Sequence, residues 1–479
     1  MQDFEGYFTL DGSVGLYSKS DNDIYHSVYG ALSEAYDKFI NPANLENYFN
    51  NNNKAEILDI CYGIGYNTKC FLNYFFKNIS RKNIKKYKTF TGNIDKIDTI
   101  NILLSKKQYI NDNKSSNYMP CNCKIYSNNI LGNQPLELNN FSIKKNIGEQ
   151  VSENKNKNKN KNKNKNSNDN KYSVFIKAID INSTLMKLSP FIKSSFKLPK
   201  YNSYKTGIEK VDLLLSKSKE IKIEKTYKLL KEVNIILIMK LIDKFKEDFF
   251  SSDVIKILKQ KSTTKFFDKN LVKFAKFYLK KRYNLSSNDY NLHFLHNIYY
   301  QYISKSYKSA LRLLENNNIN IEFVCDDARN ACNDSSERYS FIFLDAFSPA
   351  KAPALWSEEF FKLLYEHIHY NGLLLTYSKS ASIRNAMLKS NFEIGKIYNK
   401  RERKFTGTVA SKNHNLIRYK LDNYDLGLIN TLAGVTYKDK NLKLSNSEII
   451  YNRNLELENS SLQSSSSFIK KYKGAKNAI

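Results

Sequence analysis

Four short apolar segments of the chain end in one or two carboxylates, and helical patterns separate most of them. The segments are AEILDI (55–60), YSVFIKAIDI (172–181), NIEFVCDDA (320–328) and SFIFLDAF (340–347). A fifth strand-like segment, GLLLTYS (372–378), overlaps the end of the helical pattern SEEFFKLLYEHIHYNG. Apolar strands that alternate with helices predict an α/β fold whose parallel sheet is covered on both faces. Such sheets bind ligands in a crevice at the carboxyl ends of their strands.

The segment that ends on Asp345 carries the strongest functional signal. Pro349 and Pro353 follow it and hold the chain extended, because proline lacks a backbone donor and restricts the residue before it. A structural Asp would cap a helix directly, whereas here no helix is expected before about Trp356. We therefore predict that Asp345 is a catalytic carboxylate facing the crevice. Phe347 is predicted to stack on a substrate ring, with an ordinary core position as the alternative.

Three further motifs also follow predicted strands. In LDICYGIGYN (58–67), Gly63 and Gly65 allow a tight turn and a close approach of the backbone to a ligand. Asp180 ends the next long strand, where a carboxylate commonly accepts hydrogen bonds from a ribose; Asp95 is a rival for that role. In CDDAR, Asp327 is predicted either to contact an adenine edge or to cap the following helix, and the sequence leaves both open.

Composition narrows the class of partner and compartment. The 479 residues carry a formal net charge of +29, which favours an anionic partner such as nucleic acid, although an AT-rich coding bias explains part of the lysine content. The chain opens without a secretory signal, so we expect a reducing, cytoplasmic location. The lone C-x-C of Cys121 and Cys123 has no matching second pair, and no metal site is expected. No apolar stretch is long enough to span a bilayer.

The chain divides into three predicted parts. Residues 1–54 are expected to form a β-hairpin and a helix, residues 55–411 the main domain, and residues 412–479 a partly disordered extension. Around the tract NKNKNKNKNKNKN (154–166), residues 105–171 are predicted to be a disordered insertion, because a polar repeat buries no apolar surface. Residues 205–310 are mostly Lys-rich amphipathic helix and are predicted to be a helical insertion.

Five motifs in this order resemble the methyltransferase domain of the MnmC family. They are LYSKSDNDIYHSVYGALSEAYDKFI, LDICYGIGYN, DDAR, LDAFSPAKAPALW and KRERKFTGTVAS. The resemblance covers about residues 10–75, 172–195 and 290–411, and it implies a class I, S-adenosylmethionine-dependent (Rossmann-like) methyltransferase fold. It implies methylation of 5-aminomethyl-2-thiouridine at the tRNA wobble position. The chain holds no G-x-G-x-x-G motif, so we expect it to lack the flavin-dependent oxidase half of some family members.

The resemblance also implies roles for individual residues. The cofactor-binding residues would be Tyr25, Gly30, Asp59, Gly63, Gly65, Asn67, Asp180 and Asp327. Among them, Asp59, Gly63, Gly65 and Asn67 would cradle the methionine end of S-adenosylmethionine. Cys61 stands where the family usually has a glycine, and we expect it to adopt φ < 0.

A basic cluster is the predicted contact with the tRNA anticodon stem-loop. It consists of Lys351, Lys400, Arg401, Arg403 and Lys404, cations suited to phosphate contacts. A solvated charged turn is the alternative for residues 400–404. Two other functions stay open: a small-molecule amine methyl- or aminopropyltransferase on the same fold, and an inactive RNA-binding relative. The sequence does not predict the oligomeric state.

Overall fold

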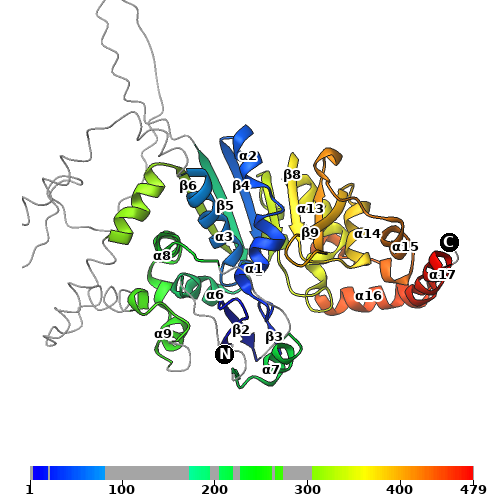
Figure 1. Ribbon diagram of the computed structural model, residues 1–479, viewed down its shortest axis with the longest axis horizontal. Coiled ribbons are helices and arrows are strands. Elements are labelled where there is room, and N and C mark those ends of the chain that lie inside the picture. The colour runs from blue at the N-terminus through cyan, green and yellow to red at the C-terminus, as the bar shows by residue number, and fades with distance from the viewer. Residues whose placement is uncertain are drawn as a thin grey trace, which may run out of the picture. The chain divides into compact units, whose positions relative to one another are not determined.

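The computed structural model describes residues 4–19, 22–80, 172–194, 204–218, 227–260, 265–272 and 305–477 (Figure 1). The predicted insertion at 105–171, Asp95 and the Cys121–Cys123 pair all lie outside the described residues.

A seven-stranded, mostly parallel sheet forms the centre of the fold, as the alternation of strands and helices predicted. From one edge to the other the strands are β6 (Asn318–Cys325), β5 (Ser173–Asp180), β4 (Lys54–Ile60), β7 (Tyr339–Leu344), β8 (Ile368–Thr376), β10 (Lys404–Ser411) and β9 (Glu393–Asn399). The first five are parallel, and β10 is antiparallel to both of its neighbours. The strand order reverses between β4 and β7. Ligands of open α/β sheets bind at such a switch point, outside the carboxyl ends of the strands.

Both faces of this sheet are buried under helices, which explains why its strands are continuously apolar. On β4 and β7, Ile57 and Phe343 belong to one apolar cluster, whereas Leu58 and Ile342 belong to the other. The first cluster includes residues of α1 (Ala31–Ala35), α2 (Leu45–Asn51), α3 (Tyr66–Tyr74) and α6 (Ser183–Leu188). The second includes residues of α12 (Ala328–Asn333), α13 (Glu358–His367) and α14 (Ala381–Lys389). In Figure 1, α3 and α13 lie on opposite sides of the sheet.

A small antiparallel sheet precedes the main one and confirms the predicted N-terminal hairpin. It contains β1 (Phe4–Phe8), β2 (Val14–Ser18) and β3 (Asp23–Ile24). The Asp11 carboxylate accepts hydrogen bonds from the backbone N–H groups of Ser13 (2.9 Å) and Ser33 (2.8 Å), so the hairpin tip rests on the first turn of α1. Gly30 fits beneath it because a Cβ there would lie 2.2 Å from the Asp11 carboxylate.

The helices in the described part of residues 205–310 include α7 (Glu209–Ser216), α8 (Lys231–Phe245) and α9 (Ser252–Lys259). Helix α8 packs against α3 and β6, and its Ile236 and Leu237 are buried in the first apolar cluster. Helix α7 packs instead on the N-terminal sheet, where Val211 joins a cluster with Tyr7. The boundaries of the predicted helical insertion remain a prediction.

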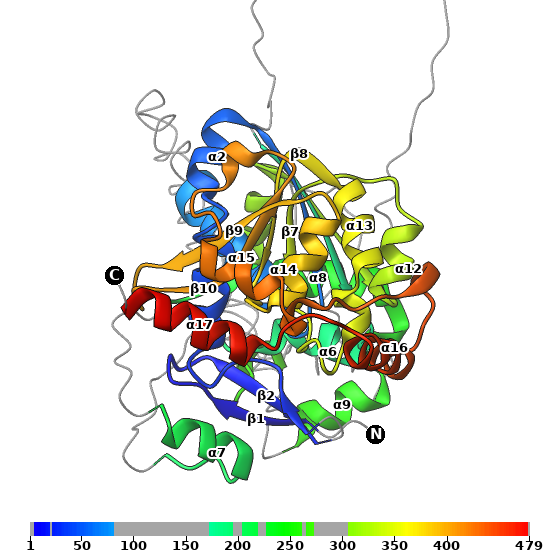
Figure 2. The ribbon, with the colours of Figure 1, turned by 90° about the vertical axis from the view of Figure 1, so that its right-hand side faces the viewer.

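The C-terminal extension is folded where the sequence predicted partial disorder. Residues 412–477 include α15 (Asn423–Ile429), α16 (Asn446–Glu458) and α17 (Ser465–Asn477). Asp439 is fully buried and pairs with Arg329 at 2.7 Å, and Ile449 of α16 is buried in the second apolar cluster. In Figure 2, α17 lies below α15, and a loop joins it to α16 at the lower right. Pairing with distant residues stabilises this extension, and local composition does not reveal such contacts.

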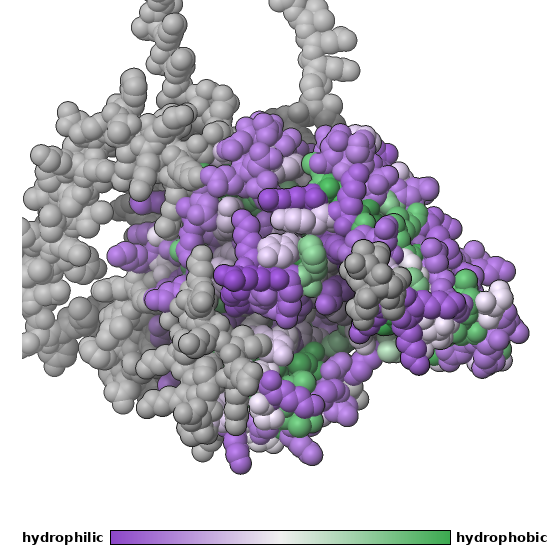
Figure 3. All heavy atoms as spheres, turned by 45° about the vertical axis from the view of Figure 1, so that its right-hand side comes forward, coloured by the Kyte–Doolittle hydropathy of each residue, from purple (hydrophilic) through white to green (hydrophobic). Residues whose placement is uncertain are grey.

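The described surface is mostly hydrophilic. Figure 3 shows exposed apolar residues only in small, separate patches on the face that it draws. None of the helices in the described ranges is long and apolar enough to cross a membrane.

Candidate active site

A pocket of about 590 Å³ opens at the carboxyl ends of the parallel strands. The segments that follow β4, β5, β6 and β7 line it together with β3, α1 and the start of α16. The residues predicted as functional that line it are Tyr25, Gly63, Asp180, Asp327, Asp345 and Phe347. Its volume lies within the range of small-molecule sites. The sequence thus predicted the location of the pocket and part of its lining.

The glycine turn after β4 forms the floor of the pocket. Gly63 and Gly65 have φ of +55° and +76°, so the turn needs the freedom of glycine at both positions. Cys61 also adopts a positive φ, +64°, which corrects the expected φ < 0. Two backbone hydrogen bonds beside it, Tyr62 N–H to Ile179 (2.9 Å) and Asp345 N–H to Ile60 (3.3 Å), hold a conformation that costs about 1–3 kcal/mol in non-glycine residues.

The two glycines play different parts in this turn. A Cβ on Gly63 would have its nearest neighbours at 3.9 Å, and Gly63 lines the pocket. A Cβ on Gly65 would instead lie 2.4 Å from the Tyr62 ring, whose hydroxyl bonds to Ser189 at 2.6 Å. Gly65 therefore serves the packing of Tyr62, and Gly63 leaves space for a ligand.

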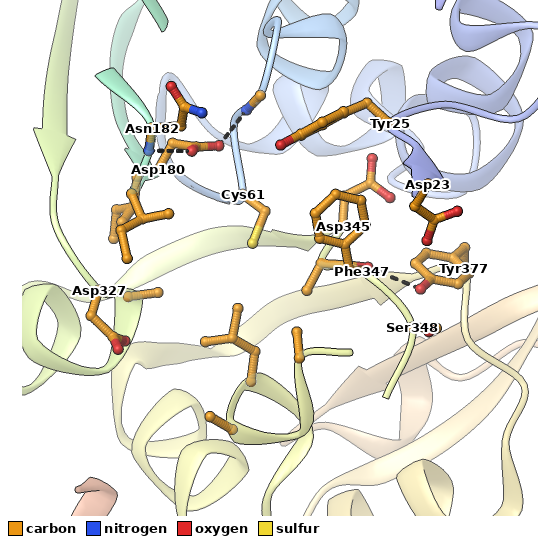
Figure 4. Close-up of a pocket in the computed structure, with 18 of the residues that line it drawn as sticks. Asp23, Tyr25, Cys61, Asp180, Asn182, Asp327, Asp345, Phe347, Ser348 and Tyr377 are labelled. Carbon is orange, nitrogen blue, oxygen red and sulfur yellow. Dashed lines mark hydrogen bonds between the residues drawn. The ribbon is translucent and has the colours of Figure 1, made fainter. Parts of the chain in front are cut away.

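Asp180 joins the glycine turn to β5. One of its carboxylate oxygens accepts the Gly63 N–H at 2.6 Å, and the other accepts the Asn182 N–H at 2.7 Å (Figure 4). Burial raises the pKa of Asp180 to about 6, although both backbone hydrogen bonds oppose the shift. Each oxygen keeps a second lone pair that can accept from a ligand hydroxyl group.

Asp59 and Asn67 lie behind the pocket wall, outside the lining. Asp59 is fully buried and accepts hydrogen bonds from the backbone N–H (3.1 Å) and hydroxyl (2.6 Å) of Thr68. Burial and the charge of Asp345 raise the pKa of Asp59 to about 7. The amide of Asn67 donates to Asp345 at 3.1 Å. These two residues, like Gly30 and Gly65, thus support the site from behind.

Asp327 has the capping role that the sequence left open. Its side chain accepts the backbone N–H of Arg329 at 2.9 Å at the start of α12 and pairs with the Arg329 guanidinium at 2.7 Å. Burial alone would raise the pKa of Asp327, but the hydrogen bonds from Arg329 hold it below its ordinary value. Asp327 also lines the pocket, on the opposite side from Asp345 in Figure 4.

Asp345 stands at the end of β7, partly exposed to the pocket. Burial and the charge of Glu34 raise the pKa of Asp345 to about 7, while Lys38 and the amide of Asn67 oppose the shift. A carboxylate with this pKa exchanges a proton readily near neutral pH.

Aromatic side chains form the wall next to Asp345. Phe347 contacts Tyr25 edge to face, with 4.9 Å between the ring centroids. The indole N–H of Trp356 donates to the Phe347 carbonyl at 2.8 Å, and the Tyr377 hydroxyl donates to the Ala346 carbonyl at 2.9 Å. These two bonds fix the loop that carries Phe347, so this ring is held at the pocket instead of in the core.

Carboxylates predominate among the charged side chains of the pocket lining, although three of them are paired with cations, and the sequence did not reveal this lining. The lining contains six carboxylates and, among the described residues, a single arginine, Arg329. The carboxylates are Asp23, Glu34, Asp180, Asp326, Asp327 and Asp345. Sequence reasoning missed Asp23 and Glu34 because one lies in an ordinary hairpin segment and the other resembles a surface helix residue. The spacing of Glu34 and Lys38 was the available signal, but an i, i+4 pair is usually solvent-exposed. Such a lining favours cationic ligands.

The predicted basic cluster is partly neutralised. Arg401 pairs with Asp37 at 2.7 Å, Lys404 pairs with Glu402 at 2.6 Å, and Lys351 pairs with Asp23 at 2.8 Å. Lys400 and Arg403 are exposed, and neither has an ion pair within the described part of the chain. They are the two cations of the cluster that are available to a phosphate.

Comparison with known proteins shows similarity to S-adenosylmethionine-dependent methyltransferases of the MnmC type. Residues 290–413 match a family described as S-adenosyl-L-methionine-dependent methyltransferase. The bifunctional tRNA 5-methylaminomethyl-2-thiouridine biosynthesis protein MnmC of Azoarcus sp. is 36% identical over 70 residues, 15% of this chain and 11% of that protein. The MnmC protein of Campylobacter fetus is 32% identical over 92 residues, 19% of this chain and 15% of that protein. The chain contains an MnmC-like methyltransferase domain.

Two further proteins are similar to this chain. An uncharacterized protein of Methanocaldococcus jannaschii is 31% identical over 140 residues, 28% of this chain and 38% of that protein. The crystal structure of MNMC2 from Aquifex aeolicus aligns with 96% of this chain and 86% of its own, at a TM-score of 0.45 and 15% identity. The sequence matches span 11% to 38% of the curated relatives' lengths.

The cofactor of the MnmC-like domain is S-adenosylmethionine, and the pocket fits this molecule. Gly63 leaves the backbone open to a close approach, and Asp180 offers free lone pairs beside it. The acidic lining complements a sulfonium and an ammonium group.

Proposed function

We propose that this chain methylates the primary amine of 5-aminomethyl-2-thiouridine at the tRNA wobble position, giving 5-methylaminomethyl-2-thiouridine. The observation that carries the proposal is a carboxylate of raised pKa, Asp345, in an acidic pocket at the switch point of an MnmC-like domain. An aminomethyl group is a cation near neutral pH, so it must be both attracted and deprotonated before it can attack. Asp345 suits both tasks.

S-adenosylmethionine, when bound, supplies an electrophilic methyl group on a positively charged sulfur. We assign Asp180 to the ribose hydroxyls and the Asp327 side of the pocket to the adenine, with Gly63 against the methionine moiety. The ordering of these groups fixes the distance over which the amine attacks, which is the main source of rate in a displacement of this kind.

Asp345 then acts on the amine. Its carboxylate accepts one proton from the ammonium, which leaves a lone pair on nitrogen to form the new N–C bond. The Asn67 amide holds the carboxylate in place at 3.1 Å. Phe347, packed on Tyr25, offers a ring face to the incoming uracil, and a base–aromatic contact of this kind contributes about 1–3 kcal/mol.

The phosphates of the tRNA would contact Lys400 and Arg403 outside the pocket. The turn that carries them is tied to the turn after α1 by the bond between Arg401 and Asp37. Because α1 also lines the pocket, RNA bound on this turn would lie beside the pocket.

A second candidate deserves a test because six carboxylates also suit a polyamine. The purified chain should be incubated with methyl-labelled S-adenosylmethionine and either tRNA carrying 5-aminomethyl-2-thiouridine, the same tRNA without the aminomethyl group, or spermidine. We expect label only in the first tRNA, at a nucleoside that mass spectrometry identifies as 5-methylaminomethyl-2-thiouridine. Label in spermidine alone would establish the small-molecule function, and label in none would favour an inactive RNA-binding relative.

A further inference from the structure

Glu34 and Asp345, which are 311 positions apart in the chain, line the same pocket. Glu34 lies in α1, whose position is set by the Asp11 contact with its first turn. One of its carboxylate oxygens accepts the Ser27 N–H at 3.2 Å, and the other forms an ion pair with Lys38. Its side chain is only 16% exposed. The fold therefore holds a second carboxylate in a fixed direction at the pocket wall.

The cost of this arrangement falls on Asp345. The Lys38 ammonium and the Ser27 N–H more than offset the burial of Glu34, whose pKa lies below its ordinary value, whereas burial and the charge of Glu34 raise the pKa of Asp345. A second carboxylate nearby adds repulsion, and Glu34 and Asp345 do interact electrostatically. The Lys38 ammonium interacts with both carboxylates and offsets part of this repulsion. A second cation at the two carboxylates would offset more of it, and the proposed reaction begins with such a cation, the substrate ammonium.

We propose that Glu34 is the second carboxylate of the amine site, which holds the substrate ammonium while Asp345 takes its proton. The proposal rests on the proposed function. In the step, an N–H bond of the ammonium breaks and an O–H bond forms on Asp345. The nitrogen lone pair then forms the N–C bond as the S–C bond breaks, leaving a neutral thioether. The product is a secondary ammonium, and the proton on Asp345 leaves to solvent after product release.

The surroundings of the two carboxylates favour this division of roles. Burial alone would raise the pKa of Glu34, but the Lys38 ammonium holds it below its ordinary value, so Glu34 stays ionised. Asp345, in contrast, has a pKa of about 7. Pairs of carboxyl groups whose pKa values are driven apart are a recurrent basis for dividing binding and proton transfer. In the described part of the chain, the charged or titratable groups that interact with these two carboxylates include Tyr7, His26, Lys38, Asp59, Cys61 and Tyr377.

His26 gives an independent sign that this end of the pocket is built for a polar ligand. It lines the pocket, and its Nε2 atom is buried with no hydrogen-bond partner. Burial lowers the pKa of His26 to about 4, so the ring is neutral and adds no positive charge against a cationic substrate.

The test uses three variants of the full chain: Glu34→Gln, Lys38→Met, and Glu46→Gln as a control that removes an exposed carboxylate of α2. For each, kcat and KM are measured from pH 5.5 to 9 with aminomethyl tRNA, and S-adenosylmethionine affinity by calorimetry. We expect Glu34→Gln to raise KM about tenfold or more, as for a lost charged hydrogen bond. The acidic limb of kcat/KM should move to lower pH, because the charge of Glu34 no longer raises the pKa of Asp345.

Lys38→Met should move the same limb the opposite way, to higher pH, since Lys38 lowers the pKa of Asp345. Glu46→Gln should leave the acidic limb of kcat/KM at the wild-type pH. A Glu34→Gln protein with normal KM and an unmoved limb overturns the inference, and so does one that only loses melting temperature. If Lys38→Met does not fold, Glu34→Asp, which keeps the charge, must retain the wild-type limb. Absence of turnover in the wild-type protein would instead reject the proposed function itself.

Discussion

The pocket and the turn at 399–404 carry opposite charges although they adjoin the same short stretch of helix. Glu34 of α1 lines the pocket, whereas Asp37, in the π-helical turn η1 (Tyr36–Ile40) that follows, binds Arg401 of the turn. The pocket contains six carboxylates and a single arginine, and the turn presents Lys400 and Arg403 to solvent. One helical stretch thus separates a site for cations from a surface for anions.

Under the proposed function, this difference in charge explains how a basic protein binds RNA and also methylates an amine. A phosphate 4 Å from a carboxylate is repelled by about 4 kcal/mol at the effective dielectric near a protein surface. Under the proposed function, the carboxylates of the lining would repel the RNA backbone from the pocket and favour a neutral base with a cationic substituent. The phosphates of the RNA would then contact the turn at 399–404.

Of the substitutions considered, the removal of the Asp345 charge should have the largest effect on turnover. Asp345→Asn keeps the size of the side chain but cannot accept a proton, so kcat should fall by about 100-fold or more. Calorimetry should show little change in S-adenosylmethionine affinity, because we assign the ribose and the adenine to residues that follow other strands.

The thermal stability of the same variant separates catalysis from structure. The pKa of Asp345 is raised in the folded protein, so stability is lost as the pH rises from the unfolded carboxyl pKa to about 7, and the full loss remains above pH 7; the Asn variant does not suffer it. We expect an unchanged or higher melting temperature at pH 8. A lower melting temperature with normal turnover would show that Asp345 is structural.

The two glycines of the turn after β4 offer a matched pair of substitutions. Both variants should lose some melting temperature, because alanine at a positive φ is strained. Gly63→Ala adds a methyl group at the pocket lining and should weaken S-adenosylmethionine binding more than Gly65→Ala does. Gly65→Ala would press on the Tyr62 ring at 2.4 Å and should lower the melting temperature more. Equal losses of S-adenosylmethionine affinity in both variants would contradict the different roles of Gly63, which lines the pocket, and Gly65, which packs against Tyr62.

The pH dependence of the wild-type protein should follow Asp345. This residue accepts a proton only when ionised, and its pKa is about 7. The value of kcat/KM should therefore fall below pH 7, by up to about tenfold for each pH unit, and level off above it. A flat profile between pH 5.5 and 7 would exclude Asp345 as the proton acceptor.

The sequence predicted the sheet and the switch-point acids because both follow from local pattern. Continuous apolar strands ending in Asp180 and Asp345 specify the edge at which those side chains meet. The sequence did not predict which of the strand-end acids face the pocket. Asp59 ends a strand in the same way, yet its carboxylate is used by Thr68 behind the pocket.

The remaining errors concern contacts between distant segments. Glu34 becomes part of the site only through packing of the N-terminal helix against the main sheet, and the pairing of Arg401 with Asp37 joins residues 364 positions apart. The positive φ of Cys61 likewise depends on backbone hydrogen bonds from two neighbouring strands. No local pattern encodes such contacts.

The outer turn should show the smallest effects, and they should depend on salt. Lys400→Ala and Arg403→Ala each remove a cation that has no ion pair in the described part of the chain, so each should weaken tRNA binding a few-fold. Each should also reduce the slope of log affinity against log salt by about 1, the signature of one lost phosphate contact. Arg401→Met is the control, because that guanidinium is already paired with Asp37 and its loss should lower the melting temperature with little change in slope. If only Arg401→Met changes the salt slope, RNA does not contact Lys400 and Arg403. These two residues then belong to a solvated charged turn.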